Sequence, residues 1–245
     1  DKISLSLIGA GNYTKGKLLP ILKSEPNLDF NGIITNSGSN SLFIKDKYKF
    51  AFNTNNVEEL LDETTNAIMI TTLHNTHANF VIKSLSKNKH VYVEKPLALN
   101  IDELKEINST YKKNDGSLIV GFNRNFSLLT EKVLSLFKGI EKKIINIRVN
   151  AGEIDKDHWT QNPKVGGGRL IGEGCHFISL ASFIASSNIS KVYTNSINSK
   201  NSEIMCNDNF NISLKFENGS IANIVYTSDG STAVEKEYVE VFGGG

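Results

Sequence analysis

The first half of the chain alternates short apolar runs with longer stretches whose apolar residues recur at helical spacing. This alternation is typical of βα units that build a parallel sheet, because strands buried on both faces appear as continuous apolar runs. Five strands are predicted, at Ile3 to Ile8, Phe30 to Thr35, Ala67 to Thr72, His90 to Val93 and Leu118 to Phe122. Helices are predicted between them, at Lys17 to Lys23, Ser41 to Tyr48, Val57 to Leu61, Thr76 to Ser86 and Ile101 to Lys113.

The pattern changes after Phe122. Helices are predicted at Leu128 to Lys138 and His176 to Ala185, and strands at Ile144 to Asn150, Val192 to Ile197, Phe210 to Phe216, Ile221 to Thr227 and Tyr238 to Phe242. Asn218-Gly219 joins two of these strands and favours a tight hairpin turn, so the second sheet should be mostly antiparallel. We therefore expect an α/β protein with a doubly wound parallel sheet over residues 1–121 and an α+β domain over residues 122–245.

Composition narrows the classes of function. The 245 residues are 39% hydrophobic and 22% charged, with a net charge of +1. This balance creates no large field for nucleic acid or a membrane surface, and no apolar run is long enough to span a bilayer. Two cysteines, Cys175 and Cys206, lack a metal-ligand spacing, so neither a disulfide framework nor a metal site is expected. We expect a cytoplasmic protein, and we interpret the start at Asp1 and the end after an apolar strand as those of a fragment truncated at its C-terminus.

A glycine-rich loop follows the first strand. Its sequence is Gly9-Ala10-Gly11-Asn12-Tyr13-Thr14, a G-x-G-x-x-G pattern with threonine at the third glycine. The first glycine suits a tight turn, and the second lets a pyrophosphate approach the backbone at a helix N-terminus. Asn36 and Ser37 follow the second strand, where an acid would select NAD and an arginine NADP. Either could hydrogen-bond to both nucleotides, so NAD and NADP both stay open.

The fourth strand ends in Glu94-Lys95-Pro96, which predicts a charged pair at the sheet edge where ligands bind. Lys95 could donate a hydrogen bond to a substrate oxygen during hydride transfer, and Glu94 could hold its ammonium. Downstream, the run from Gly166 to Cys175 leads into His176, whose ordinary pKa suits a general acid or base. If Glu94-Lys95-Pro96 stood alone, we would interpret it as a structural ion pair at the end of a strand. Likewise, His176 alone would be interpreted as a partly buried side chain with its hydrogen bonds satisfied.

Taken together, Gly9-Ala10-Gly11, Glu94-Lys95-Pro96 and the run from Gly166 to His176 resemble the Gfo/Idh/MocA family, named for glucose-fructose oxidoreductase and inositol dehydrogenase. The resemblance implies a Rossmann domain followed by an open-faced, mostly antiparallel sheet, with Lys95 contacting the substrate and His176 as acid/base. It also implies a sugar-type substrate and pairing of two copies through the open sheet. Segments such as Val120 to Phe126 and Lys156 to Trp159 further resemble dehydrogenase modules that are fused behind an alcohol-dehydrogenase domain in bacterial polysaccharide-biosynthesis proteins.

Other residues complete the expected site. Thr72 ends the third predicted strand and His74 and His77 follow it; all three are expected at the cofactor edge, without a metal. Arg124, Trp159, Arg169 and Glu173 are candidate substrate contacts, although Trp159 could equally anchor its loop and Arg169 could be solvated. The family places aspartates where this chain has Gly172 and Ser179. Because of these two departures, a catalytically silent module that senses a dinucleotide or sugar is the alternative to an enzyme, and a purely structural domain is the third hypothesis.

Overall fold

The computed structural model describes residues 2–197 and 208–245, so Asp1 and Cys206 lie outside the described residues. The chain divides into two compact units, residues 1–121 and 122–245. In the described parts of the chain, no helix is long and apolar enough to cross a membrane.

Unit 1 is built on a six-stranded parallel sheet with the strand order β3-β2-β1-β4-β5-β6. The strands are β1 (Ile3–Ile8), β2 (Leu28–Ile34), β3 (Phe52–Asn53), β4 (Ala67–Ile70), β5 (His90–Val93) and β6 (Leu118–Val120). The order runs outward in both directions from β1 and β4, which places a topological switch point between them. Ligands of such sheets bind outside the carboxyl ends of the strands at this point.

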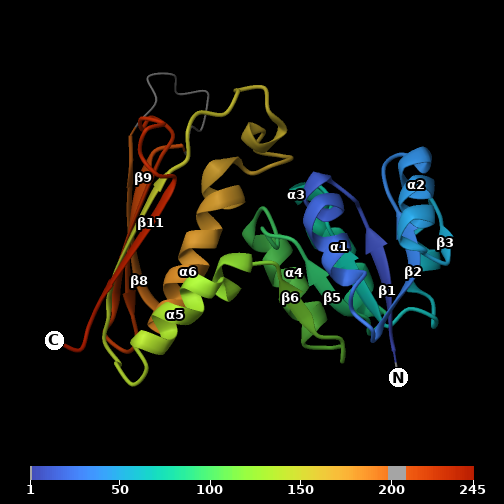
Figure 1. The fold of residues 1–245 in the computed structure, drawn as a ribbon, viewed down its shortest axis with the longest axis horizontal. Helices are drawn as coiled ribbons and strands as arrows, with labels where there is room; N and C mark the ends of the chain where they lie inside the picture. The colour runs from blue at the N-terminus through green and yellow to red at the C-terminus, as the bar shows by residue number, and fades with distance from the viewer. Residues whose placement is uncertain (1, 198–207) are drawn as a thin grey trace. The chain divides into compact units, whose positions relative to one another are not determined.

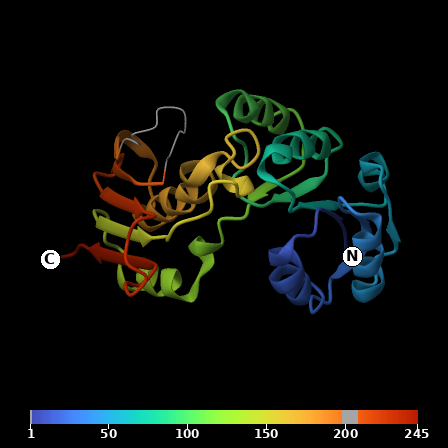
Figure 2. The same ribbon diagram turned by 90° about the horizontal axis from the view of Figure 1, so that it is seen from above.

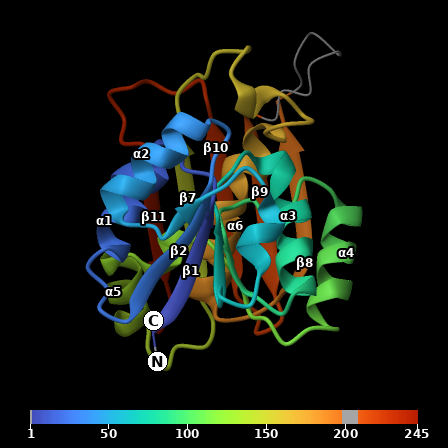
Figure 3. The ribbon, with the colours of Figure 1, turned by 90° about the vertical axis from the view of Figure 1, so that its right-hand side faces the viewer.

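Helices cover both faces of this sheet (Figures 2 and 3). They are the π-helical turn η1 (Thr14–Leu18), α1 (Leu19–Leu22), α2 (Gly38–Tyr48), the 3₁₀ turn η2 (Val57–Leu61), α3 (His74–Ser86) and α4 (Ile101–Tyr111). On one face, α3 and α4 bury Val81, Leu85 and Ile107 in a core with Ile8 and Ile70. The opposite face packs α1 and α2 against a second core, which contains Leu5, Leu7, Leu19, Ile33 and Ile44. The adjacent β1 residues Leu7 and Ile8 thus enter opposite cores, as expected for a strand that is covered on both faces.

Local signals correctly located α4. The Oδ1 atom of Asn100 accepts a hydrogen bond from Glu103 N at 2.9 Å, and Glu103 Oε2 accepts one from Leu99 N at 2.8 Å. This is close to a capping box, which satisfies amide groups that have no partner inside the helix. The sequence did not predict β3, because two residues are too few for a periodic pattern.

Unit 2 is a mixed, mostly antiparallel sheet with helices on one face (Figure 1). Its strand order among the described residues is β11-β7-β10-β9-β8, in which β7 and β10 pair in parallel and the other neighbours pair antiparallel. The strands are β7 (Ile144–Asn150), β8 (Ile189–Ser196), β9 (Phe210–Phe216), β10 (Ile221–Thr227) and β11 (Glu237–Phe242). The other elements are η3 (Asn123–Phe126), α5 (Leu128–Leu136), η4 (Trp159–Gln161), η5 (Leu170–Gly174) and α6 (Cys175–Ala185). The α/β class expected from the sequence is therefore confirmed.

The core of unit 2 lies between α6 and the sheet. Phe177, Leu180 and Ile184 of α6 pack with alternate residues of the strands, such as Ile147 and Ile224. The hairpin predicted at Asn218-Gly219 joins β9 to β10, and Gly219 has a φ of +87°, which side chains other than glycine rarely adopt. Residues on the opposite face of the strands, including Ile144 and Val225, are exposed.

Candidate active site

The first glycine of the loop after β1 is fixed by its neighbours. Gly9 has a φ of +88°, and a Cβ atom there would lie 2.7 Å from Thr72 Cγ2 and 2.8 Å from the carbonyl of Thr71. The amide of Gly9 donates to Ile34 O at 2.8 Å, and Thr71 Oγ1 donates to Gly9 O at 2.9 Å. The turn is therefore held between the carboxyl ends of β2 and β4.

The second glycine leaves space for a ligand. No atom lies within 4 Å of the position that a Cβ of Gly11 would take. Asn12 and Tyr13 are exposed beside it, whereas Thr14, in place of the third glycine, is 2% exposed and packs into the unit. A tight turn, a bare backbone and a helix N-terminus are the features that accept a dinucleotide pyrophosphate, so these residues fit the cofactor.

Asn36 and Ser37 are both exposed beyond the end of β2. Ser37 stands immediately before α2, where its hydroxyl lies 2.8 Å from that of Ser39 and its carbonyl accepts from Thr35 Oγ1 at 2.8 Å. Both side chains are at the edge where an adenosine ribose would bind, and neither carries a charge.

The segment after β4 carries two half-buried threonines, Thr72 and Thr76, and two buried histidines. Thr72 Oγ1 lies 2.6 Å from Thr76 Oγ1, which also donates to Leu73 O at 2.8 Å. His74 and His77 are both buried, with ring centroids 5.7 Å apart. His77 is fully buried and its two ring nitrogens face carbonyl oxygens, so its ring supports the main chain at this edge. The place at the cofactor edge that the sequence predicts for it stays a prediction.

Glu94 and Lys95 follow β5 and are half-buried. Glu94 N donates to Ile70 O at 2.9 Å, and Glu94 Oε1 accepts from the hydroxyl of Tyr92 at 2.7 Å. Burial raises the pKa of Glu94, although the Tyr92 hydrogen bond and the positive charge of Lys95 act in the opposite direction. The pKa of Tyr92 is raised as well, first by burial and then by this carboxyl group. Lys95 thus stands at the carboxyl edge of the same sheet as the glycine loop.

In unit 2, the expected acid/base residue is the second residue of α6. His176 is 6% exposed, and its ring meets that of Phe122 edge-on at 6.1 Å between centroids. The preceding turn, η5, is π-helical, and such turns are frequent at functional sites. Gly172 and Gly174 are buried in this turn, where a Cβ on Gly174 would lie 3.1 Å from the ring of Phe210.

Buried Arg169 and partly exposed Glu173 form a network with buried Tyr226. Arg169 Nε donates to the Tyr226 hydroxyl at 2.7 Å and lies 3.0 Å from Glu173 Oε1, while Nη1 donates to Gly152 O at 3.1 Å. The hydroxyl of Tyr226 in turn donates to Glu173 Oε2 at 2.8 Å. Arg169 is only 1% exposed and its polar contacts lie within unit 2, so the substrate contact expected from the sequence stays a prediction.

Arg124 also has an internal partner. Its guanidinium pairs in a bidentate manner with the carboxylate of Glu237 and lies 4.8 Å from the ring centre of Phe177. These contacts connect η3 to β11 and lower the pKa of Glu237, mainly through the hydrogen bonds from Arg124. The guanidinium of Arg124 is thus paired within unit 2, and the substrate contact expected from the sequence stays a prediction.

Two further residues singled out in the sequence are Trp159, in η4, and Ser179, in α6. Trp159 is 36% exposed in η4, with its ring 5.8 Å from that of His158. Ser179, which stands where the family has an aspartate, accepts a hydrogen bond from Asn125 Nδ2 at 3.0 Å.

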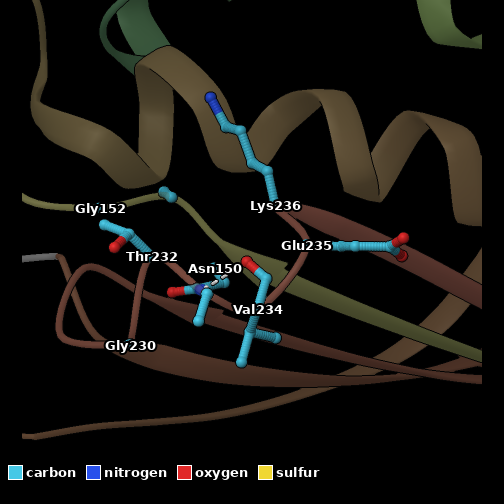
Figure 4. A pocket seen from close by; sticks show the side chains of 9 residues that line it. Asn150, Gly152, Gly230, Thr232, Val234, Glu235 and Lys236 are labelled. Carbon is cyan, nitrogen blue, oxygen red and sulfur yellow. Dashed lines mark hydrogen bonds between the residues drawn. The ribbon is translucent and has the colours of Figure 1, made fainter.

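A hollow of about 420 Å³ lies in unit 2 between the end of β7 and the loop before β11 (Figure 4). Asn150 spans the two segments, because its Nδ2 donates to Ser231 O at 2.7 Å and to Val234 O at 3.2 Å. Glu235 and Lys236 supply its charged lining. Across residues 2–197 and 208–245, no group of three or more His, Cys, Asp or Glu side chains is placed to hold a metal ion.

Several residues around these sites were not identified from the sequence. Tyr92 could have been found, because alternation along a strand places it on the same face as Glu94. Tyr226, Glu237 and Asn125 carried no such signal, since each meets a partner more than fifty residues away in the chain.

Comparison with known proteins agrees with this architecture. Residues 3–122 match the oxidoreductase family with an NAD-binding Rossmann fold, and residues 143–244 match the GFO/IDH/MocA C-terminal domain. The fold and the matched domains define an oxidoreductase with an NAD-binding Rossmann domain. The chain belongs to the Gfo/Idh/MocA family.

Individual relatives are distant. The oxidoreductase YrbE of Bacillus subtilis is 26% identical over 99% of this chain and 72% of its own length. Myo-inositol 2-dehydrogenase of Thermotoga maritima is 28% identical over 56% of this chain and 41% of its length. The structure of a levoglucosan dehydrogenase in complex with NADH and levoglucosan has a TM-score of 0.82 and 17% identity, covering 99% of this chain and 71% of that one.

Proposed function

We propose that this chain is an NAD(P)-dependent dehydrogenase acting on a carbinol or carbonyl carbon of a sugar or nucleotide sugar. The observation that carries the proposal is the shared position of the Gly9 to Gly11 loop and Lys95 at the carboxyl edge of one parallel sheet. This edge is where such folds bring a cofactor and a reacting group together. The polyol and sugar named for two relatives support the substrate class.

The chemistry divides between the cofactor and the protein. When bound, the oxidised nicotinamide would take the hydride from the carbinol carbon as the carbonyl forms. In the proposed step, the ammonium of Lys95 donates a hydrogen bond to the substrate oxygen and stabilises its developing negative charge. His176 takes the proton of the hydroxyl group and returns it in the opposite direction.

The remaining assignments follow the same proposal. The dinucleotide is NAD or NADP, because Asn36 and Ser37 can hydrogen-bond to a 2′-hydroxyl or a 2′-phosphate, and titration with NADH and NADPH measures which is preferred. Trp159 offers a partly exposed aromatic face to a sugar. A role in polysaccharide biosynthesis rests on the likeness of Val120 to Phe126 and Lys156 to Trp159, and the open sheet of unit 2 is the proposed pairing face of a homo-oligomer.

The test is reduction of NAD⁺ or NADP⁺ by the purified protein across a panel of sugars and nucleotide sugars. His176→Ala should lower kcat by about a hundredfold or more while leaving dinucleotide affinity nearly unchanged, because proton transfer is lost but the binding loop is intact. Lys95→Met should behave in the same way. Full activity of either variant would remove that residue from the mechanism.

A catalytically silent sensor of dinucleotides or sugars is the second candidate. It is favoured by the buried Gly172 and by the Asn125 contact of Ser179 at the two positions where the family has aspartates. Tight dinucleotide binding without turnover on any sugar would support it, and redox conversion of a sugar by the unaltered protein would exclude it.

A further inference from the structure

His77 connects the main chain after two neighbouring strands of unit 1. It is fully buried on α3, with Nδ1 2.7 Å from the carbonyl oxygen of Pro96 and Nε2 3.1 Å from that of Thr72. Pro96 directly follows Lys95 beyond β5, and Thr72 lies beyond β4. One side chain on a helix therefore contacts the segments that follow both strands.

The two contacts cannot both be strong in the neutral imidazole. Carbonyl oxygens only accept hydrogen bonds, and a neutral histidine has a single N–H group. Burial lowers the pKa of His77, with a smaller contribution from the charge of Lys95, while the two carbonyls oppose this. In the neutral form, the shorter distance assigns the proton to Nδ1, so the hydrogen bond to Pro96 O is the stronger of the two.

This bond completes the support of the Lys95 main chain. On the preceding side, Glu94 N donates to Ile70 O at 2.9 Å and ties the segment to β4. On the following side, Pro96 is buried and its carbonyl meets His77. Lys95 is thus anchored before and after its own Cα atom, whereas its side chain remains half-buried.

We propose that His77 is a positioning residue, whose Nδ1–H bond to Pro96 O orients Lys95 toward the reacting oxygen. The inference rests on the proposed function of Lys95. Displacement of a catalytic group by about 1 Å can cost about a hundredfold in rate, so a hydrogen bond one residue away has a large effect on turnover.

Two amide variants separate this role from simple burial. The side-chain amide of His77→Asn places its donor near the position of Nδ1, whereas that of His77→Gln places it near Nε2. His77→Asn should keep kcat within about threefold of the unaltered protein, and His77→Gln should lower it by about tenfold or more, with unchanged affinity for NADH. Equal losses in both variants, or no loss in either, would overturn the proposal.

A second measurement does not require turnover. Competitive acetylation followed by mass spectrometry gives the reactivity of Lys95 relative to Lys105, whose side chain is 70% exposed. The ratio should be retained in His77→Asn and should change by about twofold or more in His77→Gln, because reactivity depends on the surroundings of the amine. If the unaltered protein turns over no sugar, the proposed function fails, but the Lys95/Lys105 reactivity ratio still tests whether His77 supports Lys95. The same ratio in His77→Asn and His77→Gln would contradict the positioning role of His77. His77→Ser, which removes both contacts, replaces either variant that does not fold and should change the ratio as His77→Gln does.

Discussion

The two candidate regions begin alike and are held together differently. In each, a π-helical turn leads into a helix: η1 after the glycine loop in unit 1, and η5 before His176 in unit 2. The first region is fixed by main-chain hydrogen bonds between neighbouring strands, such as Gly9 N to Ile34 O. The second depends on the buried side chains of Arg169 and Tyr226 and on the partly exposed carboxylate of Glu173. The comparison shows that the main chain of the sheet fixes the geometry of the glycine loop, whereas the turn before His176 depends on side chains that lie far apart in the sequence.

Arg169→Met should expose this difference most strongly. It removes a buried cation and leaves Glu173 and the Tyr226 hydroxyl with fewer partners, so the free energy of unfolding should fall by about 3 kcal/mol. Urea denaturation followed by circular dichroism measures the loss. Arg169→Lys is the matched control, because it keeps the charge but cannot form the same set of contacts, and its loss should be smaller. If Arg169→Met costs less than about 1 kcal/mol, the network does not hold this turn.

The same difference explains what the sequence could predict. The sequence predicted one sheet edge for the glycine loop (Gly9 and Gly11) and the charged pair (Glu94 and Lys95). This was possible because a parallel sheet brings the carboxyl ends of its strands to a single edge, and the strands were recognised from their apolar residues. The positions of Arg169 and Glu173 in the chain were visible, but their partner Tyr226 lies in β10, more than fifty residues further on. A buried charge network depends on tertiary contacts that no local pattern encodes.

Alanine at the two loop glycines should separate stability from binding within unit 1. Gly9→Ala forces a Cβ against Thr71 and Thr72 at a positive φ, so the free energy of unfolding should fall by about 1 to 3 kcal/mol. Gly11→Ala meets no atom within 4 Å, so stability should be kept, but the new methyl group occupies the space expected for the pyrophosphate. Its affinity for NADH should fall by about tenfold or more.

Thermal unfolding and fluorescence titration on the same two proteins measure both effects. Gly16→Ala is the control, because it also meets no atom within 4 Å but lies outside the glycine pattern. Unchanged NADH binding by Gly11→Ala would show that the dinucleotide does not use this loop. A fully stable Gly9→Ala would show that the turn can relax without the glycine.

The smallest expected change in the free energy of unfolding comes from the ion pair between Arg124 and Glu237. Removing it tests whether unit 2 is also stabilised by a charge pair near its surface. Hydrogen bonds from Arg124 lower the pKa of Glu237 below its ordinary value of 4.5. A carboxyl group with a lowered pKa in the folded state stabilises the fold above its unfolded pKa, and this contribution is lost as the pH falls through the folded value.

Because both side chains are partly exposed, at 27% and 35%, Glu237→Gln should cost only about 0.5 kcal/mol near neutral pH. Urea midpoints measured from neutral to acid pH should show the difference between the two proteins vanishing well below pH 4.5, and salt should reduce it at neutral pH. The exposed neighbour Glu235, changed to glutamine, is the control; a constant difference across the whole pH range would mean that Glu237 acts through packing rather than through its charge.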